Sequence, residues 1–386
     1  MDSYFVLWNA LMRSGFRDFF RGLPRSERNL QVEEIMMRTN SECAKSNRAN
    51  SRRAVLSLAS LIALNWFSLA SGQETESKTP AKNPTGVSLG EAKLAGDGFK
   101  FTEGPTVDPE GNVYFTDQPN DRIVLWTVDG KLSDFLKPAG RSNGMYFAPD
   151  GKLLACADEA NELWELDLSG KHGVLLKEFE GTKLNGPNDV WVDQGGTIYF
   201  TDPYYQRPWW DHKKQPQRKQ SVYKSDRNGS NLVCVDDALV QPNGIIGDSA
   251  RRLLYVADIG DRKTYRYKIG RDGELLDRQV FCRQGSDGMT IDSEGNLYLT
   301  GSAGVYVYNA EGELIETIAI PKPWTANVCL GGKDRKTLFV TASDSVYTVP
   351  VRFAGTPGCK LDSTLPGSAS RCSAEPREPL RYDVRN

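Results

Sequence analysis

The chain has 386 residues, and its 48 lysines and arginines nearly balance its 50 aspartates and glutamates, which gives a formal net charge of −2. No basic block is interleaved with aromatic residues, so the sequence lacks the electrostatic pattern of a nucleic-acid-binding protein. The two histidines, His172 and His212, lie in no motif that would support a histidine-based nucleophilic triad or a multi-histidine zinc site.

A strongly apolar segment covers residues 54–70, directly after Ser51-Arg52-Arg53. A basic flank, an apolar stretch and small residues before the polar Gln73 have the layout of a secretory signal. The apolar stretch is also nearly long enough to span a membrane. We therefore expect residues 51–72 to be an export signal, which would send the protein to the periplasm or out of the cell, or else a retained membrane anchor.

The residues before this segment are unusual, because an export signal normally begins at the initiator methionine. Our hypothesis is that residues 1–35 are an over-called start within an N-terminal extension over residues 1–50, since Met36 or Met37 would give a basic leader of ordinary length. Residues 73–86 are polar with Pro and Gly, and we interpret them as a linker.

One pattern then occurs six times: an acid or amide, small or apolar residues, a turn, and a β-rich run. The repeats begin at Glu103, Asn143, Asn188, Asn243, Asp287 and Asn327. Their starts are 40, 45, 55, 44 and 40 positions apart, a period typical of propellers and solenoids. Most repeats resemble a β-hairpin, and a third short strand follows in every one. We predict an all-β fold, a six-bladed β-propeller over residues 87–352, with a C-terminal tail over residues 353–386.

The remaining strands have weaker patterns. We expect the fourth strand of each blade in less regular connecting segments such as residues 173–179 and 279–283. An early strand near residues 87–94 should complete the last blade and close the ring.

The first residue of each repeat has a consequence for function. The innermost strand of each propeller blade starts beside the central channel, so these six polar side chains should enter the channel at one level. Such a ring would be costly to bury unless something satisfied it. Calcium accepts carboxylate and amide oxygens, and Glu103 and Asp287 would offset its charge, whereas a ring without histidine or thiolate disfavours zinc and copper. The alternative is that Asn-Gly and Asp-Gly are merely turn dipeptides, but six polar residues in register favour the metal site.

Several of these repeats carry longer motifs: E-G-P at Glu103, L-N-G-P-N-D-V through Asn188, P-N-G at Asn243 and S-D-G-M at Asp287. Together they closely resemble the gluconolactonase and senescence-marker-protein (regucalcin-like) family, over roughly residues 90–350. The resemblance implies a six-bladed propeller with one divalent metal, usually calcium, in the channel. It also implies hydrolysis of sugar lactones and related esters, with a distant branch that hydrolyses organophosphates.

The resemblance assigns roles to individual residues. It implies metal ligands at Glu103, Asn188, Asn243 and Asp287. Asn143 looks like the neighbouring polar group that contacts substrate or a metal-bound water. From its position in the ring of six, we expect Asn327 to be left free for substrate or water as well. Tyr204 and Tyr205 would wall the substrate pocket. Asp158 stands where some relatives carry histidine, which puts the substrate preference in doubt.

The resulting hypothesis is calcium-assisted hydrolysis of a small-molecule lactone, without nucleic-acid partners and with a membrane contact only through a retained N-terminal segment. Calcium would polarise the carbonyl group, while Asp287 would activate water or attack directly as a nucleophile. Two alternatives stay open: a phosphotriesterase-type hydrolase that uses the same metal, and a non-enzymatic propeller scaffold.

The longest repeat contains an aromatic and basic insertion at residues 202–219. One interpretation is a lid that would meet sugar rings through Trp209 and Trp210 and anionic groups through Arg207. The other is a surface insertion whose tryptophans pack on the propeller wall.

Seven cysteines are present, and Cys43 precedes the export segment. The six others would be compatible with disulfides in an oxidising compartment. Cys359 and Cys372 would close a small loop in the tail, whereas Cys156, Cys234, Cys282 and Cys329 are expected as buried free thiols.

Overall fold

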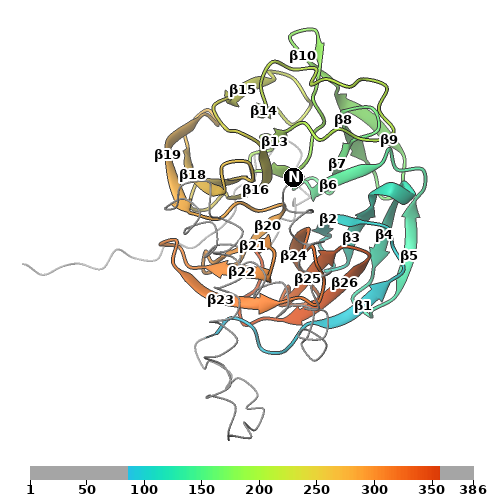
Figure 1. Cartoon of the computed structure of the whole chain (residues 1–386), viewed down its shortest axis with the longest axis vertical. Coiled ribbons are helices and arrows are strands. Elements are labelled where there is room, and N and C mark those ends of the chain that lie inside the picture. The colour runs from blue at the N-terminus through green and yellow to red at the C-terminus, as the bar shows by residue number, and fades with distance from the viewer. Residues whose placement is uncertain (1–85, 357–386) are drawn as a thin grey trace, which may run out of the picture. The chain divides into compact units, whose positions relative to one another are not determined.

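Residues 86–356 are described by the computed structural model of the chain. Within this range the chain forms six four-stranded sheets and one two-stranded hairpin, with a single 3-10 turn at Gln118–Asn120 and no α-helix. The sheets are arranged around a common axis like the blades of a propeller (Figure 1). The predicted six-bladed β-propeller is therefore confirmed.

Every blade is an antiparallel sheet. The first contains β2 (Thr102–Val107), β3 (Val113–Asp117), β4 (Arg122–Trp126) and β5 (Leu132–Leu136). The second contains β6 (Ser142–Phe147), β7 (Leu153–Ala157), β8 (Glu162–Leu166) and β9 (His172–Leu176). The third contains β12 (Val190–Val192), β13 (Ile198–Asp202), β14 (Ser221–Ser225) and β15 (Val233–Asp236). The fourth contains β16 (Pro242–Asp248), β17 (Leu253–Asp258), β18 (Lys263–Ile269) and β19 (Leu275–Cys282). The fifth contains β20 (Met289–Ile291), β21 (Leu297–Gly301), β22 (Gly304–Tyr308) and β23 (Leu314–Ala319).

The sixth blade joins the two ends of the propeller. It contains β24 (Asn327–Gly331), β25 (Thr337–Ala342), β26 (Ser345–Pro350) and, from the start of the propeller, β1 (Lys93–Asp97). β1 pairs antiparallel with β26, with Leu94 opposite Tyr347. A strand from the start of the propeller does close the ring, as predicted, but it begins at Lys93 and not near residue 87. Before Lys93, Ser88 forms only an isolated bridge to Val351.

The core lies between neighbouring blades. The second strand of each blade packs on both faces and carries a run of apolar and aromatic residues, as in β3 and β13, where every residue is buried. Trp191 of the third blade, for example, belongs to one apolar cluster with Leu254 and Val256 of the fourth. The fourth strands form the exposed outer edges, as β5 and β9 illustrate. Half of their side chains face water, and this explains why their sequence patterns are weak although their pairing is regular.

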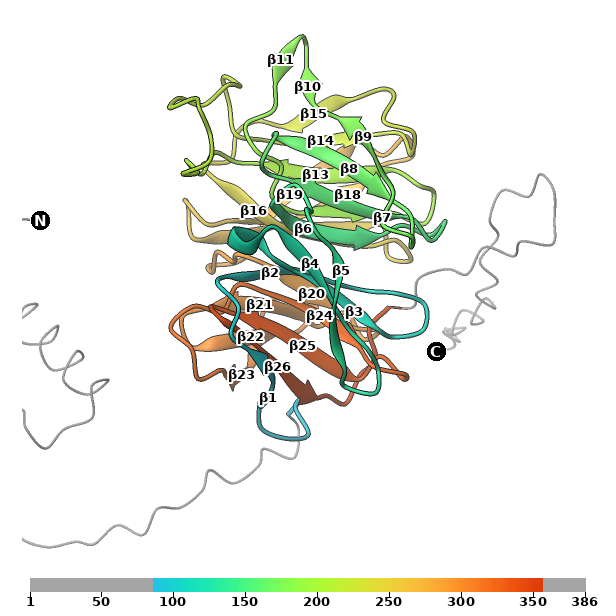
Figure 2. The same cartoon turned by 90° about the vertical axis from the view of Figure 1, so that its right-hand side faces the viewer.

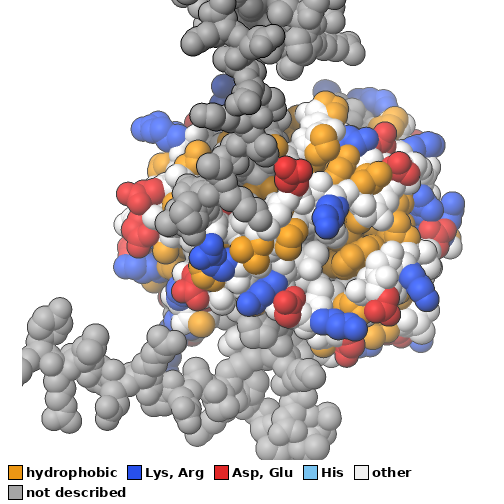
Figure 3. Space-filling model, turned by 90° about the horizontal axis from the view of Figure 1, so that it is seen from below, with side chains coloured by type: hydrophobic (Ala, Val, Ile, Leu, Met, Phe, Trp, Pro, Cys, Tyr) orange, Lys and Arg blue, Asp and Glu red, His pale blue; other side chains and the backbone are white. Residues whose placement is uncertain are grey.

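The periphery adds little regular structure. The hairpin of β10 (Glu178–Phe179) and β11 (Thr182–Lys183) projects outward beyond the third blade (Figure 2). On the face seen in Figure 3, basic and acidic side chains alternate around hydrophobic ones. Residues 86–356 contain no helix long and apolar enough to cross a membrane.

The cysteines of the propeller are thiols, as expected. Cys156, Cys282 and Cys329 are buried, whereas Cys234 is only partly so. The predictions about the N-terminal extension, the export segment and linker, Cys43 and the pair in the tail fall outside the described residues.

Candidate functional site

The first residues of the six repeats lie at the start of the innermost strands. Four belong to the strands themselves: Glu103 in β2, Asn143 in β6, Asn243 in β16 and Asn327 in β24. Asn188 and Asp287 stand just before β12 and β20. All are buried except Asp287, which is partly buried. Because consecutive innermost strands contact one another around the axis, these residues gather at one end of the channel.

A glycine that directly follows the first residue of a repeat allows neighbouring blades to approach closely. A Cβ atom on Gly104 would lie 2.0 Å from the carbonyl oxygen of Asn143, and one on Gly288 would lie 1.9 Å from Cγ of Asn327. Each glycine therefore leaves room for the first residue of the next blade. The acid-Gly and amide-Gly dipeptides at these positions form contacts between blades, so the interpretation as mere turn dipeptides is wrong here.

Two carboxylates share this end of the channel. Burial, followed by the charge of Asp287, holds the pKa of Glu103 well above its usual range. Burial also raises the pKa of Asp287, against the lowering effect of hydrogen bonds from Trp324 and Asn243. Two neighbouring carboxylates in a buried place are unfavourable unless a proton or a cation lies between them.

Asn243 supplies an oxygen without a partner. Its Nδ2 donates hydrogen bonds to Oδ1 of Asp287 at 2.8 Å and to the hydroxyl of Tyr205 at 2.9 Å. Its Oδ1 is buried and accepts no hydrogen bond from any described residue. Buried polar atoms in native proteins almost always have a partner, so this oxygen indicates that a ligand completes the site.

The residues present fit a hard cation. The candidate ligands Glu103, Asn188, Asn243 and Asp287 all offer oxygen atoms, which calcium prefers. Among residues 86–356 no cluster of three or more His, Cys, Asp or Glu side chains could hold a metal, so a cation here would depend on the two amides. The backbone places Asn188 firmly, because its N–H donates to Thr201 O at 2.9 Å and its carbonyl accepts from Gly144 N at 2.7 Å.

The two predicted tyrosines point to different places. Tyr205 lies beside Asn243, and burial strongly raises the pKa of its hydroxyl. The hydroxyl of Tyr204 donates to Oε1 of Gln206 within the same loop, and its ring lies 5.8 Å from that of Trp210, so its place in a substrate pocket stays a prediction.

Asn143 and Asn327 differ in their surroundings. Asn143 is buried in the ring, and its carbonyl oxygen accepts a 3.1 Å hydrogen bond from Thr116 Oγ1. We expected the side chain of Asn327 to be free for substrate or water, but it has partners within the protein. Its Oδ1 accepts a hydrogen bond from Val328 N at 2.8 Å, and its Nδ2 lies 3.4 Å from Oδ2 of Asp189. The repeat pattern shows which residues enter the channel, but it does not show which neighbouring residues form hydrogen bonds with them.

Two residues of this region were missed in the sequence. Asp189 is buried, and burial raises its pKa to about 7. It follows Asn188 where most other repeats have glycine, and this difference was a usable signal. Trp324, whose side chain is 48% exposed, donates from Nε1 to Oδ2 of Asp287 at 2.7 Å. It lies in an irregular loop before β24, and no repeat position identifies it.

The insertion between β13 and β14 is anchored to the second blade. Trp210 is buried and donates from Nε1 to the carbonyl oxygen of Asp158 at 2.6 Å, so this tryptophan packs on the propeller wall. Arg207 Nε donates to Oδ2 of Asp158 at 2.7 Å, and Gln118 Nε2 donates to the same oxygen at 3.0 Å. Burial raises the pKa of Asp158 to about 6, although Arg207 and Gln118 act in the opposite direction.

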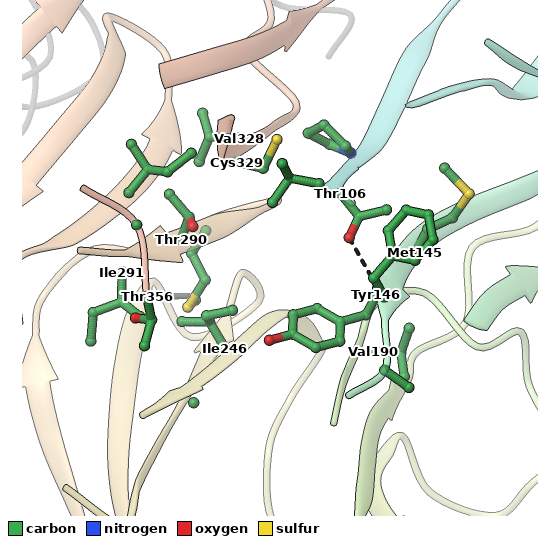
Figure 4. A pocket seen from close by; sticks show the side chains of 18 of the residues that line it. Thr106, Met145, Tyr146, Val190, Ile246, Thr290, Ile291, Val328, Cys329 and Thr356 are labelled. Carbon is green, nitrogen blue, oxygen red and sulfur yellow. Dashed lines mark hydrogen bonds between the residues drawn. The ribbon is translucent and has the colours of Figure 1, made fainter. Parts of the chain in front are cut away.

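A cavity of about 590 Å³ occupies the channel beyond the ring. The later residues of the innermost strands line it, among them Thr106, Tyr146, Ile246, Thr290 and Val328 (Figure 4). Its walls are largely apolar, and of the polar ring it touches only Asn327. Catalytic chemistry needs convergent polar groups, so we place the candidate active site at the ring and not in this larger space.

Comparison with known proteins gives the family. The family model described as SMP-30/Gluconolactonase/LRE-like region matches residues 101–344. A gluconolactonase from Zymomonas mobilis is 29% identical over 287 residues, which are 67% of this chain and 80% of the relative. A diisopropyl-fluorophosphatase from Loligo vulgaris is 27% identical over 243 residues, 54% of this chain and 75% of that protein. The solved structure of a gluconolactonase from Xanthomonas campestris superposes with a TM-score of 0.64 at 27% identity, covering 69% of this chain and 92% of the other. The chain belongs to the SMP-30/gluconolactonase/LRE-like family.

Proposed function

We propose that this protein is a calcium-dependent lactonase that opens a sugar lactone or a related cyclic ester. Membership of the family and similarity to gluconolactonases support lactone hydrolysis. The observation that carries the metal dependence is the unpartnered Oδ1 of Asn243 beside two carboxylates, the buried Glu103 and the partly buried Asp287. When bound there, calcium would supply a Lewis acid that polarises the lactone carbonyl.

Asp287 is the proposed base. Its two oxygens each accept one hydrogen bond, Oδ1 from Asn243 and Oδ2 from Trp324, and these bonds fix the plane of the carboxylate. The remaining lone pairs would accept a proton from a water molecule as the water oxygen bonds to the carbonyl carbon. The same proton would return to the ring oxygen when the ring C–O bond breaks, and the product would be a hydroxy acid.

Direct attack by Asp287 is the alternative step. A carboxylate oxygen would then bond to the carbonyl carbon as the ring C–O bond breaks and the ring oxygen takes a proton from water. Water would hydrolyse the resulting mixed anhydride by attack at the carboxyl carbon of Asp287, which releases the hydroxy acid and restores the carboxyl group. A single turnover in ¹⁸O-labelled water separates the two routes. Label found only in the product supports the base, whereas label in the Asp287 side chain supports the nucleophile.

A second candidate is hydrolysis of phosphotriesters at the same site, which the similarity to diisopropyl-fluorophosphatase favours. A non-enzymatic scaffold accounts less well for the polar ring, since binding a partner protein would not need buried carboxylates in the channel.

The test is hydrolysis of lactones and organophosphates by the full chain after EDTA treatment, with and without added calcium. We expect lactone hydrolysis to disappear with EDTA and to return with calcium. Asp287→Asn should lower kcat by about 10²-fold or more, the usual range for loss of a general base. Unchanged lactonase activity in EDTA would refute the metal dependence, and full activity of the variant would refute both roles of Asp287.

A further inference from the structure

The insertion at residues 203–220 forms a fixed wall beside the candidate active site. Its Trp210 fits over Gly186, where a Cβ atom would lie 2.8 Å from the indole Cη2. Further along, the backbone N–H of Gln217 donates to Oδ1 of Asn185 at 2.8 Å, and the carbonyl of Lys219 accepts from Asn185 Nδ2 at 2.8 Å. The side chains that this loop presents to the site are therefore held in place and do not need to be ordered when a substrate binds.

Arg207 lies one aromatic ring away from the candidate metal ligands. Its guanidinium carbon is 5.6 Å from the centre of the Tyr205 ring, and the hydroxyl of Tyr205 accepts a hydrogen bond from Nδ2 of Asn243. Only Nε of the guanidinium donates a hydrogen bond to a described residue, namely Asp158, and the side chain is 21% exposed. An arginine carries five N–H donors, so donors remain for a ligand.

A second guanidinium approaches the same place. Arg141, from the turn just before β6, lies with its guanidinium carbon 4.8 Å from the centre of the Trp209 ring, and that of Arg207 lies 5.8 Å from the same ring. The Arg141 backbone N–H donates to Oδ1 of Asp121 at 2.7 Å, and its Nη1 donates to the carbonyl of Pro119 at 2.9 Å. These bonds hold the second positive charge beside the first.

Asp158, Glu159 and Asp121 balance the formal charge of this pair. Asp121, however, is engaged by the backbone N–H groups of Ala139 and Arg141, and only Asp158 forms a hydrogen-bonded ion pair with a guanidinium. Asp158 is almost completely buried and pairs with Arg207. The partner of Arg141 is the half-exposed Glu159, whose Oε1 lies 3.5 Å from Nε without a hydrogen bond. An ion pair exposed to this degree contributes little. The indole Nε1 of Trp209, whose ring both guanidinium groups approach, is buried and has no acceptor among the described residues. Together these groups offer directed N–H donors and positive charge, the features that recognise an oxyanion.

We propose that Arg207 and Arg141 bind an anionic group of the substrate, so that the preferred substrate is a negatively charged lactone, with a carboxylate, sulfonate or phosphate remote from the ring carbonyl. This inference rests on the proposed lactonase function. It assigns the insertion the role of selecting the substrate, while the ring residues carry out the reaction.

The experiment compares three lactones that differ in charge: glucono-1,5-lactone, its 6-phosphate, and the corresponding lactone with a carboxylate at C6. The tested variant is Arg207→Gln combined with Asp158→Asn, because removing Arg207 alone would leave a buried carboxylate unpaired. Arg141→Gln is a second, separate variant. Arg278→Gln is the matched control, since Arg278 also pairs with an aspartate, Asp236, and also lies over a tyrosine ring, at 5.4 Å, but on the outer part of the fourth blade.

We expect the wild-type protein to favour the anionic lactones over the neutral one by about tenfold or more in kcat/KM, the range of a charge-assisted hydrogen bond. The double variant should lose most of this ratio, chiefly through KM, Arg141→Gln should lose part of it, and Arg278→Gln should keep it. Equal kcat/KM for neutral and charged lactones in the wild-type protein would overturn the inference, as would a ratio that survives in the double variant.

A binding measurement distinguishes failure of the anion-site inference from failure of the proposed lactonase function. Calorimetric titration with 6-phosphogluconate and with gluconate requires no catalysis. If no lactone is hydrolysed, tighter binding of the phosphate by the wild-type protein than by the double variant still supports the anion site. Equal binding of the two compounds overturns it.

Discussion

The indole of Trp324 donates from Nε1 to Oδ2 of Asp287 across 2.7 Å, and it does so from a loop that no repeat position predicts. Trp324 is 48% exposed at the channel mouth, so this hydrogen bond joins an open surface position to the proposed base. A side chain that contributes little to the core thereby orients the carboxylate on which the proposed chemistry depends.

Replacing Trp324 by phenylalanine should lower kcat by about tenfold while KM changes less, because a hydrogen bond to a charged group contributes roughly 1.5–3 kcal/mol. Steady-state kinetics and a thermal melt check this, and the Tm should stay close to that of the wild type since the residue is largely exposed. Trp164→Phe is the matched control, because its Nε1 also donates to a carboxylate, Glu162 Oε2, at 2.7 Å, away from the site. Equal kcat in both variants would show that the Trp324 hydrogen bond does not assist the reaction.

Glu103→Gln should affect the metal-free and calcium-loaded proteins in opposite directions. Without calcium, the substitution removes the repulsion between Glu103 and Asp287, so the Tm should rise. With calcium, the stabilisation that a bound ligand provides, about 2.7 kcal/mol at 100 times its Kd, should largely disappear. Differential scanning fluorimetry across a calcium titration measures both effects, with the exposed Glu91→Gln as control. If calcium raised the Tm of the Glu103→Gln variant as much as that of the wild type, Glu103 would be excluded as a calcium ligand.

The repeats predicted the blades well because their physical basis is local. The second strand of each blade is buried on both faces and therefore carries a continuous apolar run, as Phe115 and Phe200 illustrate. The polar residue near the start of each innermost strand, such as Glu103 of β2, marks the channel. The outer strands and β1 were located less accurately, because an exposed edge tolerates almost any alternation. Pairing with β26 fixes the position of β1, and this partner is far away in the sequence.

Part of the candidate site could not be predicted from periodicity. Arg207 reaches Asp158 across 49 positions and Trp324 reaches Asp287 across 37, and both contacts come from irregular loops. The insertion was recognised from its composition, but its tryptophans could be separated into a buried anchor, Trp210, and a side chain beside two arginines, Trp209, only with the fold in hand. Loops follow tertiary contacts and not a repeat period, so their contribution stays hidden in the sequence.

Asp158 should make the stability depend on pH. Burial raises its pKa to about 6 from 3.8, so the folded protein binds more protons than the unfolded chain between these values. The stabilisation of the folded protein by the protonated Asp158 carboxyl is fully present below about pH 4 and is lost as the pH rises through about 6. The difference in unfolding free energy between the wild type and Asp158→Asn should therefore fall by roughly 2–3 kcal/mol over that interval and then level off. Urea unfolding at several pH values measures it, and a difference that stays constant with pH would show that Asp158 titrates normally.

Gly186→Ala should displace the loop that carries Tyr205 and Arg207. Gly186 has a φ of +150°, which side chains rarely adopt, and an added Cβ would lie 2.8 Å from Cη2 of Trp210 and 3.1 Å from Oδ1 of Asp158. Backbone strain of this kind costs about 1–3 kcal/mol, and the displaced indole should also weaken its hydrogen bond to the Asp158 carbonyl. We expect a lower Tm together with a fall in kcat/KM that is larger for an anionic lactone than for a neutral one, because Arg207 moves with the loop. Gly173→Ala is the control, since a Cβ there would meet no atom within 4 Å. Wild-type kinetics in the Gly186 variant, despite a lower Tm, would show that the position of the loop does not govern the site.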